Sequence, residues 1–154
     1  MSLPTAQEIN PDGDLDGNVA QKNFLGKTLE EAVQLFEKNA LSSQEDLMWM
    51  GPTAFCYYFP AAVAYVRSSA ATGDSDIVSC LTSVVEFQLD GDGAEAIASA
   101  VPDILELCDH VLESYERFEI DEAIYGDLRS KYRALAERLR IEPGDPPDRP
   151  TGGR

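Results

Sequence analysis

The sequence contains few of the residues on which catalytic and metal centres depend. It has one histidine, His110, and three cysteines, none of which forms a Cys-x-x-Cys pair. Zinc sites and cysteine–histidine catalytic pairs need several such side chains in a suitable spacing. Each cysteine falls in an apolar helical pattern, so we expect buried, reduced thiols at Cys56, Cys80 and Cys108. We therefore expect no catalytic residue set and no resident cofactor, and the sequence favours a protein that is not an enzyme.

Basic residues are also scarce. The chain has 12 Lys and Arg against 28 Asp and Glu, a formal net charge of −16. Between residues 40 and 116 there are thirteen acidic residues and one basic residue, Arg67, whereas five basic residues fall between residues 129 and 140. A negative field repels nucleic acids and anionic membranes, and it favours encounter with a basic partner. We expect a protein partner with a basic surface; the plainer interpretation is that the acidic faces only keep the protein soluble.

Long uninterrupted apolar segments are absent. The densest one contains Gly51, Pro52 and Pro60, which argues against a membrane span. Residues 1–5 are followed by polar residues, where a signal peptide has an apolar region. We therefore expect a cytoplasmic protein.

That densest segment, residues 45–66, is the expected core, because it holds six of the thirteen aromatic residues. Its apolar side chains repeat at helical spacing straight through Pro60, and the opposite face is apolar as well, which is typical of a buried helix. Proline has no N–H to donate to the fourth preceding carbonyl, so we expect the helix to kink or restart at Pro60. The stripe residues are Phe55, Tyr58, Phe59, Ala62 and Val66.

These patterns predict an all-α domain of five to seven helices around a central Pro-kinked helix, within residues 24–141. Residues 1–23 are expected to form a polar N-terminal arm. Residues 142–154 hold four of the nine prolines and are expected to be a disordered tail. The alternative is an α+β fold with strands at residues 53–59 and 85–89, where apolar residues also alternate.

Two capping boxes indicate where helices begin. Thr28 with Glu31 precedes the first clear helix, and Ser42 with Glu45 precedes the next. Glu45 and Asp46 would then lie in a first helical turn, where the helix dipole stabilises negative charge and no catalytic role is needed.

The aspartates of the N-terminal arm match the spacing of an EF-hand calcium loop. The twelfth position is Asn23 instead of a bidentate glutamate, and Pro11 excludes an incoming helix. A solvated turn and a weak calcium site are thus both open interpretations. The candidate metal ligands are Asp12, Asp14 and Asp16.

A second candidate site lies beside Pro60. The carbonyl that Pro60 leaves without a helical partner can accept a hydrogen bond from water or a ligand. Aromatic residues from the same segment would line such a pocket, and the candidates are Trp49, Tyr57, Tyr58 and Pro60. His110, by contrast, is expected on the solvated flank of its helix, paired with Glu106.

Several segments resemble an uncharacterised family of small bacterial proteins: Leu3-Pro4-Thr5, Glu8-Ile9-Asn10, Phe24-Leu25-Gly26-Lys27, and residues 45–51 with the aromatic run to Pro60-Ala61. The resemblance covers about the first seventy residues and implies one bacterial domain without an established activity. The leading hypothesis is therefore an acidic, non-catalytic module that binds another protein, like an immunity protein or antitoxin. The alternatives are a metal- or small-molecule-binding protein and a structural homo-oligomer subunit.

Overall fold

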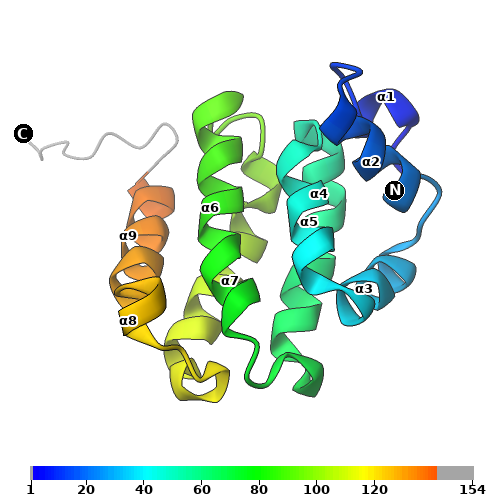
Figure 1. Cartoon of the computed structure of the whole chain (residues 1–154). Helices are drawn as coiled ribbons and strands as arrows, with labels where there is room; N and C mark the ends of the chain where they lie inside the picture. Colours follow the sequence, from blue (N-terminus) through cyan, green and yellow to red (C-terminus); the bar gives the residue numbers. More distant parts are fainter. Residues whose placement is uncertain (1, 142–154) are drawn as a thin grey trace, which may run out of the picture.

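The computed structural model describes residues 2–141; residue 1 and the expected tail, residues 142–154, lie outside the described part. Residues 2–141 form nine α-helices and no β-strand, which confirms the all-α class (Figure 1). Both segments of the α+β alternative are helical. The α-helices are α1 (Ala6–Ile9), α2 (Leu15–Phe24), α3 (Leu29–Lys38), α4 (Ala40–Trp49), α5 (Pro52–Arg67), α6 (Ser75–Gly91), α7 (Val101–Glu113), α8 (Glu122–Tyr125) and α9 (Leu128–Ile141). Three short 3₁₀ helices are η1 (Ser69–Ala71), η2 (Ala98–Ala100) and η3 (Tyr115–Phe118).

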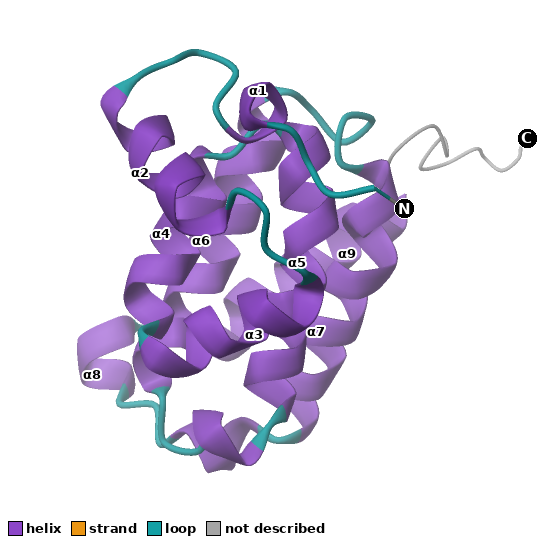
Figure 2. Cartoon of the chain, turned by 90° about the vertical axis from the view of Figure 1, so that its right-hand side faces the viewer, coloured by secondary structure: helices purple, strands orange, loops and turns teal. Residues whose placement is uncertain are grey.

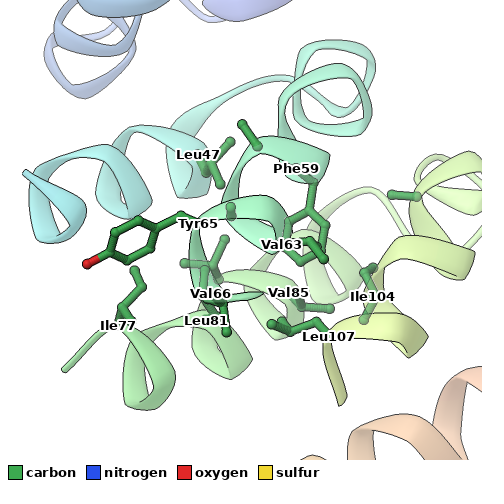
Figure 3. Close-up of a cluster of buried hydrophobic side chains, with 14 of the residues drawn as sticks. Leu47, Phe59, Val63, Tyr65, Val66, Ile77, Leu81, Val85, Ile104 and Leu107 are labelled. Carbon is green, nitrogen blue, oxygen red and sulfur yellow. The ribbon is translucent and has the colours of Figure 1, made fainter. Parts of the chain in front are cut away.

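Helix α5 is the centre of the bundle, as its apolar sequence predicts. It packs against α3 on one side and α7 on the other, while α4 packs between α2 and α6 (Figures 1 and 2). Helix α9 covers α7 and α6. Figure 3 shows side chains of α5, including Phe59, Val63 and Val66, meeting Leu81 of α6 and Leu107 of α7. None of the described helices has the length and apolar character that crossing a membrane requires.

Helix α5 neither ends nor restarts at Pro60, and one α-helix runs from Pro52 to Arg67. Pro60 has no N–H for the Cys56 carbonyl, so this turn has one helical hydrogen bond fewer than its neighbours. Packing compensates for the loss, because nine residues of α5 are buried.

Residues 1–23 were expected to be a polar arm, and this expectation is wrong for the described part of the segment. They contain α1 and nearly all of α2, which is why the helix count exceeds five to seven. Ile9 and Ala20 are completely buried in the core. Gly51, the residue before α5, donates its backbone N–H to the Ile9 carbonyl at 3.3 Å. A Cβ atom on Gly51 would lie 2.6 Å from the backbone oxygen of Glu8, so only glycine allows α1 to pack this closely.

The capping boxes predict the start of α3 correctly and the start of α4 incorrectly. The Thr28 and Glu31 capping box is present. Helix α4, however, begins at Ala40, because the side chain of Asn39 accepts the Ser42 N–H at 3.0 Å. Asp46 therefore lies in the middle of α4, on its buried face, rather than in a first turn.

Two polar side chains stabilise helix ends from distant segments. Gln88 of α6 is buried, and its Nε2 lies 3.2 Å from the Leu47 carbonyl oxygen and 2.9 Å from that of Met50, at the end of α4. The Arg117 guanidinium donates to the Val66 carbonyl at 3.1 Å and also to that of Ser68, at the end of α5. Both side chains thus supply donors to carbonyls at helix ends, including those of Met50 and Val66, for which the helix has no following N–H in place.

The basic residues of α9 form ion pairs with acidic residues of neighbouring elements. Arg129 pairs with Glu116 at 3.2 Å, Arg138 with Asp90 at 3.4 Å and Arg140 with Asp109 at 3.3 Å. The other two basic residues of α9, Lys131 and Arg133, form no ion pair within the described residues, so the positive charge that the sequence concentrates in this helix is partly neutralised.

Candidate functional site

The residues proposed from the sequence lie in two separate places. Asp12, Asp14 and Trp49 line one groove, at the end of the bundle where α1 and α2 lie (Figure 1). Tyr57 and Pro60 line a larger cavity along α5. Asp16 and Tyr58 line neither.

We call the first of these the Trp49 groove: Asp12 and Asp14 from the α1–α2 segment, Trp49 from α4, and Phe87 and Asp92 from α6 and the residues that follow it. Its volume is about 300 Å³. The rings of Trp49 and Phe87 meet edge to face, with centroids 5.1 Å apart. Phe87 is 45% exposed although it belongs to a core-packed helix. The groove therefore combines an accessible aromatic pair with three carboxylates.

Helix capping accounts for Asp14, the N-cap residue of α2, which accepts the Gly17 N–H at 2.8 Å. Among residues 2–141 no three His, Cys, Asp or Glu side chains come close enough together to hold a metal ion. The geometry thus gives Asp12, Asp14 and Asp16 no common point at which to bind calcium, and the calcium site gains no support from it. The carboxylates of Asp12 and Asp92 form no hydrogen bond or ion pair within the described chain.

We call the second place the Pro60 cavity. It has a volume of about 720 Å³. Its lining residues come from the N-terminal segment, the start of α3, α5, and the segment that leads into α7, and Figure 2 shows the positions of these elements. Helix α5 contributes Thr53, Cys56, Tyr57 and Pro60, which share one face because they are spaced three or four residues apart. The remaining lining residues are Ser2, Pro4, Glu8, Leu29, Ala96, Ser99 and Asp103.

Asp103 is the acidic residue of this cavity whose pKa departs from its ordinary value. It is half-buried in the first turn of α7, and burial, followed by the nearby charge of Glu106, raises its pKa. Glu106 itself pairs with Arg67 at 3.4 Å, in a smaller hollow that shares Pro60 and Asp103 with the cavity. No lysine, arginine or histidine of the described chain lines the Pro60 cavity. Its electrostatic character is therefore negative.

Tyr58 does not line the Pro60 cavity, although the sequence analysis proposed it as a pocket residue. The side chain is fully buried, and its hydroxyl lies 3.0 Å from the Phe24 carbonyl oxygen and 2.8 Å from that of Lys27. Burial raises the pKa of Tyr58 to about 12, so the hydroxyl stays protonated and ties α5 to the segment before α3.

His110 was expected in solvent beside Glu106, and this was wrong. Its ring is half-buried against Phe118, with centroids 6.1 Å apart, and Glu106 pairs with Arg67 instead. Burial, helped by the charge of Arg117, lowers the pKa of His110.

The sequence interpretation missed the buried acid Asp46, which is 4% exposed and accepts a hydrogen bond from Asn23 at 2.8 Å. Burial raises the pKa of Asp46 to about 6, although the Asn23 hydrogen bond acts in the opposite direction. The start of α4 would have revealed this burial. When the helix begins at Ala40, the helical repeat places Asp46 on the same buried face as Ser43 and Met50.

Comparison of the chain with protein-family models, curated proteins and solved structures gives no match. The assignment of a function therefore rests on the chain's own residues and their geometry.

Proposed function

We propose that the protein is a non-catalytic module that binds a basic protein partner, and that the Trp49 groove receives an arginine or lysine side chain of this partner. The observation that carries the proposal is the exposed Phe87 ring, packed edge-on against Trp49 in a groove that three aspartates line.

Aromatic faces and carboxylates together suit a cationic side chain. A guanidinium or ammonium group gains energy over an aromatic face, and more when it is partly desolvated. The carboxylates of Asp12 and Asp92 are available for such a group, since neither has a partner within residues 2–141. The groove volume of about 300 Å³ is at the lower end for small-molecule pockets and is consistent with a single long side chain.

The rest of the surface favours the same type of partner. Four arginines of the described chain are engaged in ion pairs, and the Arg117 guanidinium binds backbone carbonyls. Five of the ten basic side chains within residues 2–141 are thus held in local contacts. Leu15, which follows Asp14, is 81% exposed and adds an apolar contact of the kind that protein interfaces bury.

Quantitative capture experiments test this function. The immobilised protein is incubated with extract of its native host at low and high salt, and bound proteins are identified and quantified. We expect a basic partner whose capture falls as salt rises, because electrostatic steering is screened.

Charge-matched variants separate the groove from the overall field. Asp12→Asn with Asp92→Asn removes two charges from the groove, and Glu119→Gln with Glu122→Gln removes two at exposed positions near α8. We expect only the first pair to reduce capture strongly. Equal capture by both double variants, or no specific partner at either salt concentration, would contradict the proposal.

A further inference from the structure

We propose that the Pro60 cavity binds a small organic amine in its protonated form, with the ammonium group at Asp103 and the apolar part against Tyr57 and Pro60. This site is separate from the Trp49 groove, so the inference stands or falls independently of the proposed protein partner.

The cavity has the size and walls of a ligand site. Its volume of about 720 Å³ lies well within the range of roughly 300–1,000 Å³ that small-molecule sites occupy. One wall is the central helix α5, which the core holds on its other sides. Pro4, Leu29 and Pro60 supply apolar surface, and Thr53 and Ser99 supply hydroxyl groups.

The charges along the cavity select a cation. Asp103 is half-buried, and no cation or hydrogen-bond donor within the described residues compensates its carboxylate. Arg67 lines the adjoining hollow together with Asp103, but its guanidinium pairs with Glu106. An ammonium group beside Asp103 would supply the missing charge, whereas an anion would meet the carboxylates of Asp103 and Glu8 and no cation among the lining residues.

Tyr57 supplies an aromatic wall for the apolar part of the ligand. Its ring lines the cavity and is held in place by the ring of Tyr58, at a centroid distance of 4.9 Å and an angle of 83°. Tyr58 is itself fixed by its buried hydroxyl contacts. An aromatic ring with restricted freedom, in the same cavity as a half-buried carboxylate, suits an amine that carries an apolar group.

Three probes of nearly equal size and different charge test the inference: 2-phenylethylamine, 2-phenylethanol and phenylacetate. Binding is followed by ¹H–¹⁵N NMR of the full chain and by thermal melting. We expect the amine to shift signals of cavity residues and to raise the melting temperature, since a ligand that binds the native state stabilises it. The alcohol should bind at least tenfold more weakly, and phenylacetate should not bind.

Two variants of α7 residues test whether the ammonium group of the ligand binds at Asp103. Asp103→Asn keeps the shape of the side chain but removes its charge, and Glu113→Gln removes a charge from an exposed position on the same helix. We expect Asp103→Asn to weaken amine binding about tenfold, which is typical for loss of one charge-assisted contact. It should leave the weaker binding of the alcohol unchanged, and Glu113→Gln should behave like the wild type.

Three results would overturn the inference. The first is equal amine affinity in wild type and Asp103→Asn, with both proteins shown by NMR to be folded. The second is binding of phenylacetate as tightly as of the amine. The third is the absence of cavity shifts with any probe at millimolar concentration.

Discussion

Gln88 offers the most informative test of how the fold builds the Trp49 groove. Its side-chain amide lies within hydrogen-bonding distance of three carbonyl oxygens at the end of α4, those of Leu47 (3.2 Å), Met48 (3.1 Å) and Met50 (2.9 Å). These residues flank or precede Trp49, so Gln88 fixes the backbone that carries the indole ring. The residue itself is only 4% exposed.

Gln88→Leu removes both amide donors. The Leu47 carbonyl keeps the Met50 backbone N–H at 3.3 Å, but the Met48 and Met50 carbonyls lose the donor that Gln88 supplies. Each unpaired buried group costs about 1–3 kcal/mol, so we expect a loss of roughly 2–4 kcal/mol in the free energy of unfolding. Gln88→Glu should be worse at neutral pH, since a buried carboxylate faces carbonyl oxygens and its folded-state pKa is raised. That penalty is absent below the unfolded pKa of about 4.3 and grows as the pH rises through the folded pKa.

Urea unfolding followed by fluorescence of Trp49, the sole tryptophan, measures both effects. Gln34→Glu, on the exposed surface of α3, is the matched control and should change stability by less than about 0.5 kcal/mol. If both Gln88 variants unfold at the same urea concentration as the wild type, the capping argument is refuted.

Three further predictions concern other parts of the fold. Asp46→Asn should stabilise the protein at pH 7 by on the order of 2 kcal/mol and have no effect near pH 4, because the raised pKa of about 6 means that ionisation of Asp46 opposes folding as the pH rises from about 4 through 6. Urea unfolding at several pH values measures this, with the exposed Glu37→Gln as the control, and a pH-independent difference would refute it. Gly51→Ala should lower stability by about 1–3 kcal/mol, because its Cβ would lie 2.6 Å from a backbone oxygen of α1. In the control Gly91→Ala the new Cβ meets no atom within 4 Å, so this variant should be tolerated. Equal thermal melts of the two variants would argue against close packing at Gly51. Arg117→Met should lower the free energy of unfolding by about 2–4 kcal/mol, because it removes the donors to the carbonyls of Val66 and Ser68 at the end of α5. An unchanged thermal melt would show that these contacts contribute little.

The parts of the fold that the sequence predicts correctly are those that local periodicity determines. The apolar stripe identifies α5 as the central helix, and the Thr28 capping box marks the start of α3. The structure has a cavity beside Pro60, but the sequence indicates only that the Cys56 carbonyl loses its helical donor, and the cavity walls come from distant segments.

The remaining features depend on contacts between distant residues. Asn39 and Ser42 are both good N-cap residues, and only the packing of α4 against α2 and α6 places its start at Ala40. For the same reason nothing local indicates that Asp12 and Asp14 share a groove with Trp49. Phe87 was missed because it lies on a helix whose aliphatic side chains are buried.

The most direct test of the central claim is a titration of Trp49 fluorescence with an arginine-rich peptide that contains no aromatic residue. We expect a saturable change at low salt that weakens at high salt and is lost in the Asp12→Asn and Asp92→Asn double variant, but not in the Glu119→Gln and Glu122→Gln control. A peptide with glutamine in place of arginine should produce no change. An identical response from both double variants, or no response to the arginine peptide, would show that the Trp49 groove does not recognise cationic side chains.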